Sequence, residues 1–334
     1  MARLMFVGDI SLGEYYLSFG HGPKSIVDSG GYVFENVHDL FQECDFLMGN
    51  LEGVLSEIGL DESDPASAVL RGNDESFSQL VKANFSMVSI ANNHTLQHGV
   101  DCFSDMCRSL QERNILISGL TEKPITYHSI DGLIVAFISA SSVTVDYFND
   151  QYLKYDLSVL LELISKARKN CDYLIVNLHW GQELSLESSV DQKQEAQRLR
   201  EAGVDLVIGH HPHVVQEFDM TRQGLIAYSL GHFVFDLPWD ERMRCSLVLD
   251  VTLDKEGISE ARAWPVFLDN SGIPGKTDLH VDLSDRGIHK VYNHSELSNS
   301  EIGRKLIYFF KHYMQGHTVL KTKFLFKKIA DWIF

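Results

Sequence analysis

Seven short apolar runs, each ending in a polar loop, constrain the fold of this chain most strongly. They cover residues 4–9, 46–52, 85–94, 133–141, 173–181, 205–213 and 225–233. Runs of this length bounded by polar residues predict buried β-strands. Stretches with helical periodicity lie between several of them, at 100–113, 156–170 and 191–202. This alternation predicts an α/β architecture.

The pattern changes after about residue 240. Residues 246–269 predict a β-hairpin that turns at 254–257, followed by a further strand. Residues 270–300 are polar and turn-rich, so we expect a connecting segment after a domain at 1–269. Residues 301–334 carry seven lysines and arginines against two acidic residues, and their aromatic side chains include Phe309, Phe310, Phe324, Phe326 and Trp332. We expect a basic amphipathic helical tail that packs on the domain, with peripheral contact to a membrane or a protein as the alternative.

The composition excludes some partners and locations. The formal charge of −17 offers no overall basic surface for nucleic acid. The five cysteines, Cys44, Cys102, Cys107, Cys171 and Cys245, lack metal-site spacing and are expected to be reduced thiols. The first predicted strand leaves no room for a signal peptide, and no run of about 18 apolar residues predicts a membrane span. We therefore expect a cytoplasmic protein.

Polar side chains follow six of the predicted strands where each strand ends. In open α/β sheets, ligands bind beyond the carboxyl ends of the strands. Carboxylate, amide and imidazole groups suit Zn, Mn or Fe, and a pair of such ions can activate a bridging water. One such residue is more often an ordinary loop residue, whereas six strand ends together predict a site for one or two divalent metals. The residues are Asp9, Asn50, Glu52, Asn93, His94, His179, His210, His211, His213 and His232.

Three of these histidines lie in the stretch "IGHHPHVVQ" at 208–216. In an extended segment, residues i and i+2 point to the same side, and proline disfavours the helical conformation for the residue before it. We therefore expect Pro212 to keep His211 and His213 extended and facing one site. His210 is expected to point the opposite way and to be structural.

Six ordered motifs resemble the CapA family of capsule and poly-γ-glutamate synthesis proteins, a branch of the calcineurin-like metallophosphoesterases. They are "GDISLG" (8–13), "GNLEG" (49–53), "ANNHTLQHG" (91–99), "LHWGQE" (178–183), "IGHHPHVVQ" (208–216) and "AYSLGHFVFD" (227–236). The resemblance spans roughly residues 3 to 252. It implies a four-layer α/β/β/α metallophosphoesterase-like sandwich with a metal site at the strand ends, extended here by the basic helical tail.

The resemblance also implies roles for single residues. Asp9 matches the first aspartate of the Asp-x-His motif, whose histidine is replaced by Ser11. Asn50 stands where phosphoesterases have a bridging aspartate, so Glu52 must supply the charge. These departures leave one good metal site or two weaker ones.

The remaining implied ligands are Asn93, His179, His211 and His213. His94 matches the histidine that supports a phosphate or leaving group.

Two further residues are candidates for proton transfer. His232 stands where the family more commonly has asparagine, so it is an added ligand, an acid/base or a variant loop residue. Glu183 follows the "HWG" motif and is expected to orient a histidine or accept a proton, unless it is simply solvated.

Three cations are candidates for binding an anionic substrate. His21, Lys24 and Arg71 lie in loops after the first two strands, with ordinary solvated cations as the alternative. Arg71 is favoured because a similar basic residue recurs there in the family.

The resemblance predicts a CapA-like metal-dependent hydrolase acting on an anionic polymer, peptide or phosphorylated intermediate of capsule or cell-surface polymer biosynthesis. Two alternatives stay open: a non-catalytic accessory subunit of a polymer ligase or export complex, and a metal-dependent peptide epimerase.

Overall fold

Two packed β-sheets form the centre of the molecule. The structure is a computed structural model, and it describes all residues except 146–149, 237–238, 293–300 and 334. The first sheet runs β16 (Pro274–Lys276), β15 (Ile258–Leu268), β14 (Cys245–Leu253), β1 (Ala2–Ile10), β2 (Phe46–Leu51), β5 (Met87–Ser89), β6 (Leu116–Ser118). In addition, β13 (His232–Val234) pairs with β1, and β17 (Val281–Asp282) pairs with β15. Strands β13, β1, β2, β5 and β6 are parallel, so their carboxyl ends share one edge.

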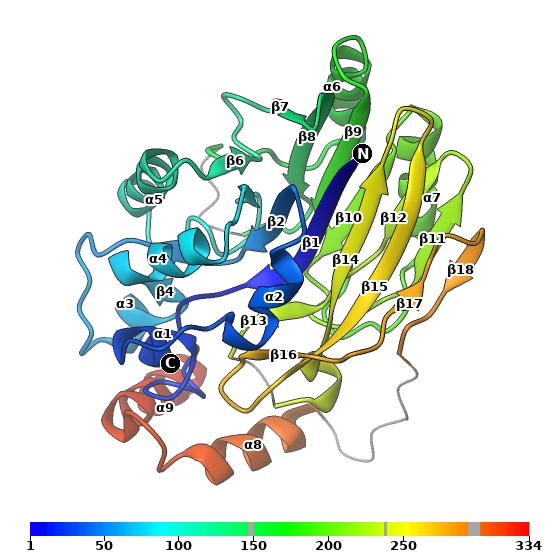
Figure 1. The fold of residues 1–334 in the computed structure, drawn as a ribbon. Coiled ribbons are helices and arrows are strands. Elements are labelled where there is room, and N and C mark those ends of the chain that lie inside the picture. Colours follow the sequence, from blue (N-terminus) through cyan, green and yellow to red (C-terminus); the bar gives the residue numbers. More distant parts are fainter. Residues whose placement is uncertain (146–149, 237–238, 293–300, 334) are drawn as a thin grey trace.

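The second sheet runs β18 (Gly287–His289), β11 (Phe218–Thr221), β12 (Gly224–Ala227), β10 (Leu206–His210), β9 (Tyr173–His179), β8 (Leu133–Ser141), β7 (Thr126–Ile130). Its four central strands are parallel. A separate short ribbon pairs β3 (Val54–Leu55) with β4 (Arg71–Gly72). Helices cover both outer faces, as Figure 1 shows, and the central strands β2, β9 and β10 are buried along their whole length.

Three apolar clusters define four layers. The first packs α4 (Asp74–Lys82) and α5 (Val100–Glu112) on the first sheet. The second lies between the sheets, where the rings of Phe46 and Phe137 stack at 4.9 Å. The third packs α6 (Leu157–Ala167) and α7 (Val190–Glu201) on the second sheet. Because side chains alternate along a strand, Phe6 faces the inner cluster and Val7 the outer one. The layers are those of the predicted α/β/β/α sandwich.

Short helices connect the strands near the shared edge. They are α1 (Pro23–Asp28), α2 (His38–Phe41) and α3 (Pro65–Ala68), with 3₁₀ turns at Glu35–Val37 and Glu241–Arg244. The hairpin of β14 and β15 turns at 254–257, where Asp254 Oδ1 accepts hydrogen bonds from the amides of Glu256 and Gly257. All five cysteines are free.

Two segments differ from the expected organisation. The run at 225–233, predicted as one strand, splits into β12 and β13 in different sheets, because the chain turns between them at Gly231, whose φ is 72°. The segment at 270–300, predicted to be a connection, contributes the short strands β16, β17 and β18, and its residues 293–300 lie outside the described part.

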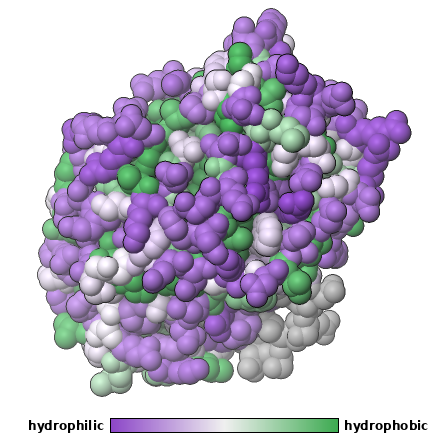
Figure 2. Space-filling view, viewed as in Figure 1, coloured by the Kyte–Doolittle hydropathy of each residue, from purple (hydrophilic) through white to green (hydrophobic). Residues whose placement is uncertain are grey.

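The tail forms α8 (Glu301–His312) and α9 (Thr318–Ile333), which lie together at the foot of the view in Figure 1. The face of the molecule shown in Figure 2 is mostly hydrophilic. Among the residues that the structure describes, no helix combines the length and apolar character needed to cross a lipid bilayer.

Candidate metal centre

Strand register brings the predicted site residues side by side at the common edge of the two sheets. In the first sheet, Asp9 at the end of β1 lies between Asn50 on β2 and His232 on β13. In the second sheet, His179 at the end of β9 lies beside His210 on β10. The sheets pack face to face, so these two rows of polar residues meet where the strands end.

A fully buried group of ligand atoms lies at this meeting point. Asp9, Glu52 and His179 each offer one atom, and these atoms lie within 4.8 Å of one another. Glu52 Oε1 is 3.9 Å from His179 Nε2 and 3.9 Å from His213 Nε2. The resemblance implied that Glu52 supplies the negative charge that Asn50 lacks, and the Glu52 carboxylate lies between His179 and His213 in this group.

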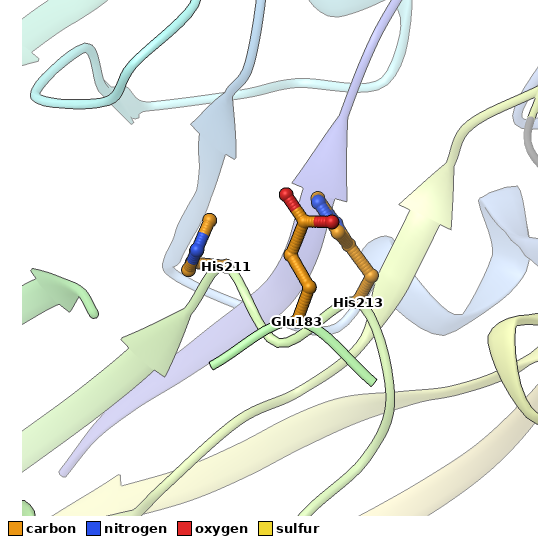
Figure 3. Close-up of side chains that lie close together, drawn as sticks. All are labelled: Glu183, His211 and His213. Carbon is orange, nitrogen blue, oxygen red and sulfur yellow. The ribbon is translucent and has the colours of Figure 1, made fainter. Parts of the chain in front are cut away.

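A second group adjoins the first one on its solvent side. Glu183, from the loop after β9, lies with His211 and His213 in another set whose ligand atoms are within 4.8 Å (Figure 3). Glu183 is exposed and both histidines are buried. His213 joins the two groups because its Nδ1 is 3.5 Å from Asp9 Oδ2. The arrangement offers ligands for one or two ions.

The conformation expected for the His-Pro-His stretch is wrong. His211 and His213 have φ values of 93° and 61°, so the chain turns sharply where an extended segment was predicted. The turn is fixed by distant contacts: the amide of His211 donates to Asp9 Oδ2 at 3.4 Å, and the Pro212 carbonyl accepts from Leu184 N at 2.8 Å. Positive φ at residues other than glycine costs free energy and clusters at functional sites.

The expected orientation of His210 is also wrong. Its Nδ1 lies 3.2 Å from Asp9 Oδ1, so it faces the centre. The alternation rule that pointed it away applies to an extended chain, and the strand ends at this residue.

Sequence reasoning also missed Asn92. Its Nδ2 donates to Asn50 Oδ1 and to the Leu51 carbonyl, and its Oδ1 accepts from the His94 amide. Its position beside the "NH" pair in "ANNH" was the only signal for it in the sequence.

Asn50 supports Asp9. Its Nδ2 donates to Asp9 Oδ1 at 2.9 Å and lies 3.3 Å from His179 Nδ1, while its Oδ1 accepts from Asn92. This orientation directs the amide oxygen of Asn50, its potential ligand atom, away from Asp9. Asn93 places its Oδ1 2.7 Å from His179 Nε2, which keeps that oxygen in the group.

Several ligand atoms of the centre lack hydrogen-bond partners within the described part of the chain. They include both carboxylate oxygens of Glu52, Ser11 Oγ, the Nδ1 atoms of His210, His211 and His213, and both ring nitrogens of His232. Buried polar groups are almost always partnered, and an unpaired buried carboxylate is costly. Oxygen and nitrogen donors of this kind are those that divalent transition ions prefer. The residues present therefore fit a bound divalent metal.

Burial sets the protonation states of the histidines. It lowers the pKa of His179 and His232 well below the usual value, with repulsion from neighbouring histidines adding to the effect. Burial and His213 lower the pKa of His211 to about 3. Neutral imidazole is the form that binds a metal, so these side chains are prepared as ligands.

The two buried carboxylates differ. Burial disfavours the charge on Asp9, but the close approach of the His210 and His213 rings, at 3.2 and 3.5 Å, outweighs it and holds the Asp9 pKa well below its usual value. Burial raises the pKa of Glu52 well above its usual value, and repulsion from Asp9 and Glu183 raises it further. A positive ion at the centre would offset the unfavourable charge on Glu52.

The two remaining candidates for proton transfer differ in access to solvent. His94 is partly exposed at the mouth of the centre, with Nδ1 2.7 Å from Gln97 Oε1 and Nε2 3.8 Å from Glu52 Oε1. His232 is fully buried and stacks on Phe235 with ring centroids 4.2 Å apart, beside the ring of His213 at 4.5 Å. His94 is therefore the histidine that a substrate can approach.

The three predicted substrate-binding cations have protein partners elsewhere in the described structure. Arg71 is buried and donates to the backbone carbonyls of Ser56 and Ile58. Lys24 pairs with Asp28 and Glu62. His21 lies beside Lys321 and His312. These contacts account for the positions of all three, and their contact with a substrate stays a prediction.

Comparisons with known proteins match this chain to one family. The family described as bacterial capsule synthesis protein PGA_cap matches residues 3–237. The "PGA biosynthesis protein CapA" of Bacillus subtilis is 30% identical over 274 residues, 78% of this chain and 70% of that protein. The "Capsule biosynthesis protein CapA" of Bacillus anthracis is 32% identical over 265 residues, 73% of this chain and 62% of that protein. The chain thus spans about two thirds of the length of these relatives.

Solved structures show weaker similarity. A novel phosphatase from Mycoplasma pneumoniae superposes with a TM-score of 0.46 and 15% identity, covering 84% of this chain and 93% of that one. A 5'-nucleotidase from Candida albicans has a TM-score of 0.46 and 15% identity, covering 81% of this chain and 53% of that one.

Proposed function

The chain belongs to the bacterial capsule synthesis protein family, as its motifs predict, and we propose that it is a metal-dependent hydrolase. The proposed substrate is an anionic polymer, peptide or phosphorylated intermediate of capsule or cell-surface polymer biosynthesis. The observation that carries the proposal is the buried set of carboxylate and imidazole atoms without hydrogen-bond partners in the described chain. The names of the Bacillus relatives support the biosynthetic setting.

The ligands would come from both sheets. Asp9, Glu52, His179 and Asn93 would hold one ion, and His211 and His213 with Glu183 would hold a second or complete the first. A bound divalent ion supplies Lewis acidity and lowers the pKa of a coordinated water toward neutrality. Mn, Zn and Fe are the candidate ions for this mixture of oxygen and nitrogen ligands.

The side chains at the mouth would handle protons. The Nδ1 atom of His94 interacts with Gln97, which fixes the ring and leaves Nε2 directed into the centre, where it can meet a leaving group. Glu183 is exposed beside His211 and His213, so its carboxylate can orient a histidine or accept a proton from the substrate side. His232 lies behind His213, where it can support that ring.

The test combines metal analysis with a substrate panel. We expect protein purified without added metal to retain a divalent ion, and to hydrolyse a phosphomonoester, a phosphodiester or a γ-glutamyl peptide in a metal-dependent way. Asp9→Asn and His211→Ala are expected to abolish both properties. His128→Ala, at an exposed histidine on β7, is the matched control and is expected to change neither. Retention of full activity by His211→Ala without bound metal would refute the proposal.

The same experiment separates the alternatives. Metal binding without turnover of any member of the panel would favour the accessory subunit. Exchange of a peptide α-proton with deuterated solvent, without chain cleavage, would favour epimerisation.

A further inference from the structure

One face of the tail carries exposed apolar side chains. Ile302, Leu306 and Phe310 lie one turn apart along α8, and Met314 follows in the turn after it. Residues four apart share one face of a helix. These four side chains are between 50% and 79% exposed, and Val319 and Phe326 of α9 are also exposed. Large apolar groups gathered in this way indicate an interaction surface.

The opposite face of α8 anchors the tail to the body. Tyr308 and Phe309 pack against Leu17, Val214 and Trp239 in a buried cluster. The Arg304 guanidinium pairs with buried Asp240 at 2.9 Å. The tail therefore already has a packed face, and the exposed stripe is a second face that the described residues of the body do not cover.

A buried lysine fixes α9 in the same way. Lys321 has no exposed surface, and its Nζ donates to the carbonyls of His312 and Gln315 at 3.1 and 2.8 Å. Tyr16 stacks on Phe324 with ring centroids 4.0 Å apart. The two helices are held on the body with their outer face turned to solvent.

The charge of this face is opposite to that of the rest of the chain. Residues 302–330 contain no Asp or Glu, whereas the whole chain has a formal charge of −17. Lys311 and Lys327 are exposed and directly follow the exposed Phe310 and Phe326 in the sequence, whereas Lys323 donates to the Ser63 carbonyl. An anionic surface would repel most of this protein and attract this face. Lysine beside exposed Phe, Ile and Leu is the composition of helices that lie in the lipid interface.

We propose that the outer face of α8 and α9 docks on the surface of an anionic phospholipid bilayer. The apolar stripe would enter the boundary between head groups and acyl chains, with the lysines at the head groups. Val214, which the buried face of α8 contacts, directly follows His213. Docking would therefore hold the metal centre close to the membrane surface. The proposal does not depend on what the centre catalyses.

The test is co-sedimentation of the full chain with vesicles of phosphatidylcholine, alone or mixed with phosphatidylglycerol. We expect binding to the mixed vesicles only, and its loss at high salt. Phe310→Ser is expected to weaken binding about tenfold, because it removes a large apolar side chain from the interface. Lys311→Glu combined with Lys327→Glu is expected to weaken it at least about tenfold.

Matched controls lie away from the tail. Leu279→Ser changes a side chain that is 77% exposed, and Lys255→Glu changes an exposed lysine in the hairpin turn. Neither is expected to alter binding, and all variants should keep the circular dichroism spectrum of the parent protein. Unchanged vesicle binding by Phe310→Ser, or equal binding to neutral vesicles, would overturn the proposal. So would a lipid-free dimer that Phe310→Ser dissociates, because that result assigns the face to a second copy of the chain.

Discussion

Replacing Glu52 with glutamine should change stability in opposite directions with and without metal. In the metal-free protein, the carboxylate is fully buried, accepts no hydrogen bond within the described chain and is repelled by Asp9. Leaving a buried group of this kind unsatisfied costs about 1–3 kcal/mol. Glu52 can escape this cost only by taking up a proton, in keeping with its raised pKa, whereas a glutamine of the same shape is neutral without one and can donate to Asp9. We therefore expect Glu52→Gln to stabilise the metal-free protein by about 1–2 kcal/mol, or roughly 1.5–3 °C in Tm.

With metal, the same change removes a ligand. An ion present at a hundred times its Kd stabilises the native state by about 2.7 kcal/mol. Loss of a charged ligand weakens affinity, so most of this increment should vanish in Glu52→Gln. Thermal unfolding is measured for both proteins after chelation and again at one fixed metal concentration. The parent protein should show the larger metal-induced rise in Tm, and the variant the higher Tm in chelator.

Asp9→Asn is the informative comparison. Asp9 accepts a hydrogen bond from Asn50 and lies against His210 and His213, so its charge is favourably placed even without metal. Its replacement should lower Tm under both conditions. Glu256→Gln, in the exposed hairpin turn, should leave both values unchanged. The reasoning fails if Glu52→Gln lowers the Tm of the chelated protein while the metal-induced rise stays at its parental size.

Three further outcomes follow from the structure. Burial lowers the pKa of Lys321 to about 8 from 10.5, so the native protein binds fewer protons than the unfolded chain between those pH values. The free energy of unfolding of the parent protein minus that of Lys321→Met should therefore rise across that pH interval, by at most about 3 kcal/mol, when measured in urea. A difference that does not change with pH would contradict the lowered pKa of Lys321. Phe309→Ala should lower the free energy of unfolding by about 3 kcal/mol, whereas its exposed neighbour in Phe310→Ala should change it by about 0.5 kcal/mol or less. In denaturant, His213→Val should be about 1–2 kcal/mol less stable than His213→Asn. Both variants lose the imidazole, but only valine is strained at the φ of 61° that residue 213 adopts. Equal stabilities of the two variants would argue against the strained turn.

The buried strands could be predicted from the sequence because both of their faces are covered. In β9 every residue is buried, so the apolar run and its polar end are visible without knowledge of the fold. Strands β12 and β13 could not be separated in this way, since their residues form one apolar run and only the turn at Gly231 divides them. The strands of the 270–300 segment are two or three residues long, which is too short for a periodicity to show.

The candidate centre was predictable as a set of residues and not as a geometry. Polar residues at parallel strand ends must meet at one edge, which identified Asp9, Glu52 and His179. The path of the chain through His211 and His213 depends on two hydrogen bonds, one that the His211 amide donates to Asp9 and one that the Leu184 amide donates to the Pro212 carbonyl. A local rule for the residue before proline therefore gave the wrong conformation, and with it the wrong direction for His210.

The position of Asp9 explains why Tm can report on this centre. Asp9 lies in register with Asn50 and His232 in the first sheet and contacts His210 and His213 from the second. Ligands from both sheets can approach one ion only while the sheets remain packed, so the unfolded chain retains no such site. Metal binding therefore contributes to the free energy of global unfolding, and not only to the order of the surrounding loops. A substitution at the centre should accordingly change the stability of the whole sandwich. A Glu52→Gln variant whose Tm is higher than that of the parent protein in chelator and lower in metal would therefore identify Glu52 as a ligand.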